Sequence, residues 1–217
     1  MQQSKTLIPV TPFQQLTSNW DQARTNASQV ISLVDAGSAG EYHSFEIPAS
    51  TQLLVPASCA YIHGYMVCSP NFDSLQMLLI SDEIDESIKQ GATQVPGDAI
   101  CTLNYNAISF PSFLQSGFLE RIEAWQNHKD NWANEVVDAG NSDPNMSVVR
   151  VFTIPVSDWQ NIIGSDAQVF LALKSPELVE TSVEVILATT NGEVQFYDIS
   201  TPIPPYPGGG DNFGLLS

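Results

Sequence analysis

Phe45-Glu46-Ile47-Pro48-Ala49-Ser50 returns later in the chain as Phe152-Thr153-Ile154-Pro155-Val156-Ser157, at an offset of 107 residues. Three further matches lie around it in the same order: Val34-Asp35-Ala36-Gly37 with Val137-Asp138-Ala139-Gly140, Phe13 and Trp20 with Phe118 and Trp125, and Ala60-Tyr61-Ile62 with Ala167-Gln168-Val169. A shared order and nearly constant spacing predict a tandem duplication of a lobe of about 105 residues. This length exceeds that of a solenoid repeat and suits a small domain used twice.

Each lobe is predicted to contain a helix, a strand, a short helix and antiparallel strands. In the first lobe, Thr11-Pro12 offers a cap and a proline at the first helical position, and helix continues over residues 27–34. In the second lobe, Pro111-Ser112 opens a longer helix that Gly140 closes, before a polar loop over 141–145. The Ile-Pro-x-Ser pattern predicts a strand that runs into a short helix, with Ser50 or Ser157 near its cap.

Runs of apolar residues with turn signals between them predict the remaining strands. They cover residues 60–68, 75–80 and 99–104 in the first lobe, and 167–174, 182–189 and 193–199 in the second. Asn191-Gly192 is typical of a hairpin turn, and residues 82–96 form an acidic insertion. The fold class is therefore α+β, with two lobes packed about a pseudo-twofold axis. The expected units are 1–106, 107–200 and a Pro/Gly-rich tail over 201–217.

The charge balance is strongly acidic, with 7 Lys and Arg against 24 Asp and Glu and a net charge of −17. Both predicted lobes share the excess. Such a charge repels phosphate backbones and anionic lipid surfaces, so we expect neither nucleic-acid nor membrane binding. The acidity can serve solubility, or it can attract a basic partner or a cation.

The three cysteines, Cys59, Cys68 and Cys101, form no CxxC pair, and their odd count argues against a disulfide scaffold. The stretch Leu7-Ile8-Pro9-Val10 is too short for the apolar core of a secretory signal, and no apolar run reaches the length of a membrane span. We therefore expect a cytoplasmic protein.

The strand predicted over residues 59–68 carries the most suggestive side chains. Alternation places Ile62, Gly64 and Met66 on a core face, and Tyr61, His63 and Tyr65 on the opposite face. These rings, with Glu41 and His43 as further candidates, could contact a ligand or a partner. They could equally pack beneath a helix or against the other lobe.

Motifs for catalysis and metal binding are missing from the sequence. His43, His63 and His128 match Arg150, Phe170 and Ala23 in the other lobe, so no histidine recurs. Cys59 and His63 would lie roughly 13 Å apart on one strand, too far to react together. The sequence also lacks the HExxH, GxSxG and phosphate-loop patterns. We expect no catalytic residue, cofactor or metal.

Two groups of acidic residues still need an interpretation. Asp35 and Asp138, inside the repeated Val-Asp-Ala-Gly, fit helix ends, although two facing carboxylates could share a proton or a cation. The run Asp82-Glu83-Ile84-Asp85-Glu86 has oxygen ligands for Ca²⁺ but lacks the spacing of a calcium loop, which favours a solvated loop.

The tail combines a proline-rich stretch over 201–207, three glycines and the apolar end Asn212-Phe213-Gly214-Leu215-Leu216-Ser217. Such a tail is either disordered or a docking peptide, in which case Phe213, Leu215 and Leu216 would dock.

These features favour a non-enzymatic interaction or assembly protein that binds a protein partner or itself. Low use of Lys and Glu is typical of interface cores, and Phe13, Trp20, Phe118 and Trp125 are expected at or beneath the contact between lobes. The alternative is a small-molecule-binding protein or enzyme with its site in the crevice between the lobes. A third hypothesis is a regulator that binds a basic protein through its acidic surface.

Overall fold

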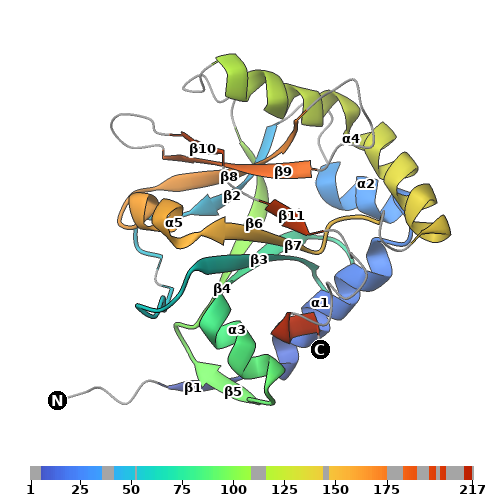
Figure 1. Cartoon of the computed structure of the whole chain (residues 1–217). Coiled ribbons are helices and arrows are strands. Elements are labelled where there is room, and N and C mark those ends of the chain that lie inside the picture. The colour runs from blue at the N-terminus through green and yellow to red at the C-terminus, as the bar shows by residue number, and fades with distance from the viewer. Residues whose placement is uncertain are drawn as a thin grey trace.

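The computed structural model describes residues 6–35, 42–51, 53–108, 116–143, 147–174, 183–189, 196–198, 201–203 and 213–216. Its helices are α1 (Thr11–Ala23), α2 (Ala27–Asp35), α3 (Asp82–Lys89), α4 (Ser116–Ser142), α5 (Val156–Ile162) and the 3₁₀ turn η3 (Gly214–Leu216). Its strands are β1 (Leu7–Pro9), β2 (Tyr42–Ile47), β3 (Tyr61–Cys68), β4 (Leu75–Ser81), β5 (Gln94–Pro96), β6 (Ile100–Ile108), β7 (Val151–Pro155), β8 (Ala167–Leu173), β9 (Val183–Thr189), β10 (Phe196–Asp198) and β11 (Thr201–Ile203). The chain is thus of the α+β class, as predicted (Figure 1).

Nine of the described strands form one antiparallel sheet, in the order β10-β9-β8-β2-β6-β4-β3-β7-β11. β2 pairs with β8 on one side, with Phe45 opposite Val169, and with β6 on the other, with Phe45 opposite Tyr105. β3 lies between β4 and β7. β1 and β5 form a separate two-stranded ribbon. Four strands from the first half of the chain, β2, β6, β4 and β3, therefore lie together in this sheet, with strands of the second half on both sides.

The two ends of this sheet come together. β10 and β11 stand at opposite ends of the strand order, yet only two residues separate Asp198 from Thr201. Because consecutive Cα atoms are 3.8 Å apart, these ends lie within about 11 Å of each other. β11 also contacts β9. The sheet therefore curls until its first and last strands meet.

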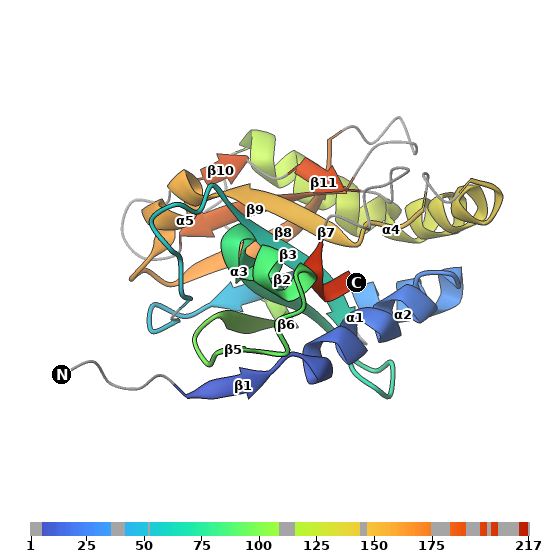
Figure 2. The same cartoon turned by 60° about the horizontal axis from the view of Figure 1, so that its bottom comes forward.

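Alternation along the strands gives the curled sheet an inner and an outer apolar face. The inner face belongs to the main core, which also receives Trp20 of α1 and Trp125 of α4. Part of the outer face, with Tyr65 and Leu78, packs under α1, α3 and the tail. Another part, with Phe170, packs under α4. Figures 1 and 2 show α4 along β8 and β9, and α1 and α3 against β3 and β4.

Several expected helix boundaries are wrong. The N-cap of α1 is Val10 rather than Thr11, although a proline does occupy the first turn. α4 continues past Gly140 to Ser142, and its predicted start at Pro111-Ser112 lies outside the described residues. The acidic insertion is not a loop, since it folds into α3 and β5.

The two Ile-Pro-x-Ser segments also behave differently. The second leads into α5 as expected, and the buried side of that helix carries Trp159 and Ile162. In the first, Ala49 and Ser50 form a turn and no helix follows. Pro56 stands where a helix equivalent to α5 would end, and proline disfavours helix at its own position and at Val55 before it, so no more than about one turn could form after Ser50.

The predicted strands of the sheet are confirmed for β2, β3, β4, β6, β7, β8 and β9, within a few residues at their ends. Of the expected strand over 193–199, the structure describes residues 196–198, which are strand (β10), and residues 201–203, in the proline-rich stretch, also form a strand. The Asn191-Gly192 turn lies outside the described residues. None of the described helices is both long and apolar enough to cross a bilayer.

Candidate functional site

A buried carboxylate links two of the aromatic rings on the outer face of β3. The Oδ2 atom of Asp85, on α3, lies 2.8 Å from Nδ1 of His63 and accepts a hydrogen bond of 2.6 Å from the Tyr65 hydroxyl. Asp85 and Tyr65 are 1% and 0% exposed. The Oδ1 atom of Asp85 has no hydrogen-bond partner among the described groups. This set is therefore a desolvated polar centre inside an apolar layer.

The hydroxyl of Tyr65 keeps its proton in this setting. Burial raises the pKa of Tyr65 well above its ordinary value, and the charge of Asp85 and the hydrogen bond to it raise it further. The phenol is thus a donor at any physiological pH, and Asp85 is its acceptor. This arrangement fixes α3 against β3.

The tail segment, residues 213–216, covers this polar centre. The ring of Phe213 meets the rings of His63 and Tyr65 edge to face, at centroid distances of 4.9 and 6.1 Å. Phe213 is 5% exposed and Leu215 is 1% exposed. The buried Thr17 hydroxyl, on α1, lies 2.8 Å from the carbonyl oxygens of both Leu215 and Gln14, and its one proton is shared between these two acceptors. Apolar and polar contacts together hold the segment.

Gly214 allows the tail segment to approach α3 closely. A Cβ at this position would lie 2.9 Å from Cβ of Ile88 and well inside the contact distance of the Asp85 carbonyl oxygen. Backbone atoms cannot yield as a flexible side chain can. The segment can therefore sit against α3 only because this residue has no side chain. We call the surface that receives it, formed by Thr17, His63, Tyr65, Asp85 and Ile88, the tail-docking surface.

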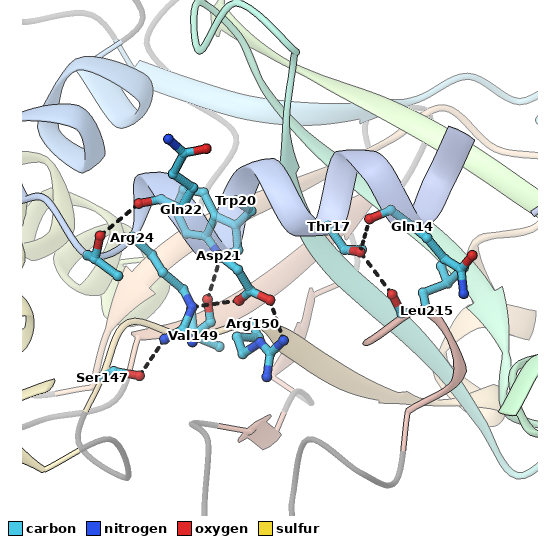
Figure 3. A network of polar contacts seen from close by, with 11 residues as sticks. Gln14, Thr17, Trp20, Asp21, Gln22, Arg24, Ser147, Val149, Arg150 and Leu215 are labelled. Carbon is cyan, nitrogen blue, oxygen red and sulfur yellow. Dashed lines mark hydrogen bonds and ion pairs between the residues drawn. The ribbon is translucent and has the colours of Figure 1, made fainter. Parts of the chain in front are cut away.

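A network of polar contacts fixes α1, one wall of this surface (Figure 3). Asp21 lies between Arg24 and Arg150 and forms an ion pair with each. Arg24 also donates to the Ser147 hydroxyl, at 2.5 Å. The indole Nε1 of Trp20 donates to the Val149 carbonyl at 2.9 Å. α1 is thus tied to the segment that precedes β7.

The other predicted ligand residues do not join the tail-docking surface. Tyr61 shares the face of His63 and Tyr65 but lies at the start of β3, where it is 48% exposed. His43 is buried and stacks on Tyr105 at 5.3 Å. Tyr105 belongs to the main core, which is separate from the cluster that contains Tyr65. Glu41 lies outside the described residues.

The residues expected between lobes divide among three apolar clusters. Trp20 and Trp125 both enter the main core. Phe13 packs beside the tail segment, in the cluster around Tyr65, whereas Phe118 packs on β8 and β9. Asp35, from the repeated Val-Asp-Ala-Gly, pairs with Lys129 of α4 at 2.8 Å.

Cys59 and Asp82 form a second polar group at the start of β3. Burial raises the pKa of the Cys59 thiol to about 11, and its hydrogen bond with Asp82 contributes to the rise. The Oδ2 atom of Asp82 accepts hydrogen bonds of 3.1 Å from the backbone N–H groups of Ala60 and Tyr61. This cysteine is a poor nucleophile, because the thiolate is the reactive form. Among the described residues, no three His, Cys, Asp or Glu side chains gather as a metal site would require.

Thr17, Asp85 and Ile88 are the site residues that the sequence analysis does not predict. The acidic run around Asp85 favours a solvated loop on composition alone. Ile84 and Ile88, one helical turn apart, carry the signal that this run is an amphipathic helix with one face buried. No local signal pointed to Thr17, because its partner Leu215 is 198 residues away in the sequence.

No protein family model matches the chain, and comparisons with curated proteins and with solved structures find no significant match. The chemistry of the chain's own residues therefore carries the functional argument.

Proposed function

We propose that this chain is a non-enzymatic interaction or assembly protein that binds a protein partner or itself. The observation that carries the proposal is the seating of the tail segment on the tail-docking surface. A short aromatic and aliphatic peptide, remote in sequence, is held there by ring contacts, by a close backbone approach at Gly214 and by the hydrogen bond from Thr17. Surfaces that recognise peptides combine side-chain contacts with main-chain hydrogen bonds in this way.

The chemistry of the surface supports binding rather than catalysis. His63 and Tyr65 both direct their polar atoms at Asp85, and Phe213 lies over both rings. Cys59, at the start of β3, is a poor nucleophile, because burial raises the pKa of its thiol to about 11. These side chains build and order a binding surface.

Native mass spectrometry of the full chain, purified gently from its own host, tests this proposal. We expect a discrete oligomer or a co-purified protein that remains attached. A monomer at every concentration, with no attached protein, would contradict it.

A small-molecule-binding protein or enzyme is the second candidate function, and one observation favours it. The Oδ1 atom of Asp85 is buried without a hydrogen-bond partner among the described groups, and a ligand donor could satisfy it once the tail segment had left. His63→Ala should then abolish binding of the small molecule that accompanies a monomer in the mass spectrum, whereas Tyr61→Ala, outside the surface, should leave it bound. Retention of that molecule by the His63→Ala variant would contradict this site.

We infer further that the chain arose by tandem duplication, with the two copies related by a pseudo-twofold axis. The order β6-β4-β3-β7 has a counterpart in β10-β9-β8-β2. β2 pairs with β8 of the other copy, and β7 pairs with β3. β6 pairs with β4 along its first part and with β2 along its last part. Its counterpart in the other copy is divided in two: β10 pairs with β9, and β11, which follows after two residues, pairs with β7. In each copy, the first strand of the large sheet (β2 or β7) therefore pairs with a strand of the other copy. This reciprocal exchange supports a duplication with the copies 1–106 and 107–200.

A cytoplasmic location also belongs to the proposal. Cys59, Cys68 and Cys101 are all free thiols. Unpaired cysteines in both half-buried and buried positions suit a reducing compartment. Fractionation of the host cells would test the location, and recovery with secreted proteins would contradict it.

A further inference from the structure

We propose that the tail-docking surface also receives the tail segment of a second copy of this chain, so that two copies exchange residues 213–216 reciprocally. This inference rests on the proposed assembly function and names its partner and its contact.

The surface recognises an uncharged segment in which an aromatic residue is followed by glycine and then by leucine. Phe213 contacts the rings of His63 and Tyr65, and Gly214 passes the backbone of Asp85 where a side chain would collide. Leu215 is buried, and its carbonyl accepts from Thr17. None of residues 213–216 is charged, so the segment adds no carboxylate beside Asp85 in a chain with a net charge of −17. The tail of a second copy meets each of these requirements.

The covalent connection is long enough for exchange. Ile203 pairs with Val151, and Val151 pairs with Tyr65, against which Phe213 packs. Two strand spacings therefore put Ile203 about 10 Å from Tyr65 within the sheet. Residues 204–212 number nine, and a chain of nine residues can extend to about 30 Å. The connection exceeds what docking on its own surface requires, so a neighbouring surface is within reach.

Reciprocal exchange keeps both surfaces covered. If the segment left without replacement, Tyr65, Ile88 and neighbouring apolar side chains would face water, and the buried Asp85 would lose its cover. Exchange of an identical element repeats every contact in the second copy, so its cost is small. A foreign partner would cover one copy's surface and release that copy's own apolar segment into water. A second copy therefore fits this surface better than a foreign peptide.

Concentration decides between the two arrangements. A tethered segment has an effective concentration in the millimolar range for its own surface. Exchange between freely diffusing copies must compete with that value, so it grows with protein concentration and is favoured where copies are packed side by side. The chain should therefore be monomeric when dilute and form dimers through the tail when concentrated.

The first test measures binding of a labelled peptide of residues 211–217 to the full chain by fluorescence anisotropy. Phe213→Ala weakens the chain's own segment and leaves the surface intact. We expect this variant to bind the peptide at least tenfold more tightly than the wild type, whose own segment competes. The matched control peptide carries Gly214→Val, and it should bind at least about 100-fold more weakly because its added side chain meets the backbone of α3.

The second test is complementation between two full-length variants that carry different mass tags. Phe213→Ala has a defective segment and an intact surface, whereas Thr17→Phe has a blocked surface and an intact segment. Neither should dimerise alone, but a concentrated mixture should give a heterodimer in native mass spectra. Adding Gly214→Val to the Thr17→Phe chain should abolish that heterodimer. Thr17→Val keeps the volume but removes the hydrogen bond to Leu215. Added to the Phe213→Ala chain, it should weaken binding of the labelled peptide, and it guards against misfolding of the larger substitution.

The outcomes separate this inference from the proposed function. Dimers that form equally well with Phe213→Ala and Gly214→Val would overturn tail exchange, while assembly through another surface would stand. Peptide binding without any heterodimer from folded variants would also overturn exchange and leave the surface as an internal clamp. A wild-type chain that is monomeric and without a partner at every concentration would overturn both.

Discussion

At the scale of single residues, Trp20 fixes α1 to the body of the molecule. It is 2% exposed in the main core, and its Nε1 donates to the Val149 carbonyl. Trp20→Ala should lower the free energy of unfolding by about 3–5 kcal/mol, because a large cavity replaces the ring. Trp20→Phe is the control: it keeps most of the volume and should cost about 1 kcal/mol for the lost hydrogen bond, together with a smaller packing loss. Chemical denaturation measures both, and a Trp20→Ala curve that matches the wild type would contradict the placement.

Cys59 supplies a second prediction for a single residue. Burial raises the pKa of its thiol to about 11, so at pH 8 far less of it is thiolate than in an ordinary cysteine. Alkylation of Cys59 by iodoacetamide should therefore be roughly 100-fold slower in the folded chain than in the denatured chain. Asp82→Asn should speed the alkylation of Cys59 in the folded chain, since the hydrogen bond and charge of Asp82 contribute to the raised pKa of the thiol. Peptide mass spectrometry follows each cysteine separately, and equal rates in the folded and denatured chains would contradict the expectation.

At the scale of elements, α3 carries an acid-sensitive part of the stability. Burial of Asp82 would raise its pKa, but hydrogen bonds from Cys59 and from the backbone N–H groups of Ala60, Tyr61 and Glu83 outweigh this effect, so that the pKa is lowered. Because the pKa is lower in the folded state, ionised Asp82 stabilises the folded chain at pH values above the ordinary aspartate pKa of about 3.9. This stabilisation is lost as the pH falls below that value toward the folded pKa.

Asp82→Asn should therefore cost about 1 kcal/mol at pH 6 and much less at pH 3. Urea unfolding at a series of pH values gives the difference. Glu86→Gln, on the same helix, is the control for a general loss of negative charge. A cost for Asp82→Asn that stays constant with pH would show that its hydrogen bonds do not depend on ionisation.

The same helix shows what local sequence could and could not predict. α1, α2 and most strands agree with their apolar periodicity, because each buries one face against the sheet. α3 was missed because its acidic residues suggested a solvated loop, although the acidic first turn and Lys89 at its end are typical of a helix. The docking of Phe213 on His63 and Tyr65 depends on a contact between distant parts of the chain, which periodicity cannot supply. For the same reason, the pairing of β2 with β8 could not be read from either strand alone.

At the scale of the whole molecule, the excess of acidic residues should govern the response to salt. Arg24, Arg121, Lys129, Arg150 and Lys174 form ion pairs, but the 7 Lys and Arg residues of the chain are too few to neutralise its 24 Asp and Glu residues. Salt weakens these pairs, each worth at most about 1 kcal/mol when partly exposed, but it also screens the repulsion of a net charge of −17. We expect the second effect to dominate, so that raising NaCl from about 10 mM to 0.5 M increases the melting temperature by several degrees. A melting temperature that falls instead would show that the ion pairs of α1 and α4 outweigh the repulsion.

Strand exchange across the sheet predicts how the chain behaves when it is divided. A cut between residues 112 and 113, six residues past the proposed boundary at 106, keeps β6 whole and leaves β2 without β8 and β7 without β3. In the fragment 1–112, the edge of β3 that pairs with β7 becomes free, and in the fragment 113–217 the edge of β8 that pairs with β2 becomes free. Each fragment alone would expose unpaired strand edges and should not give a cooperative melt. Mixed or co-expressed fragments should restore both exchanged pairs and melt cooperatively as a 1:1 complex, which circular dichroism and native mass spectrometry would detect. A cooperative melt from either fragment by itself would mean that its core does not need the exchanged strand, and that the two copies can fold as independent lobes.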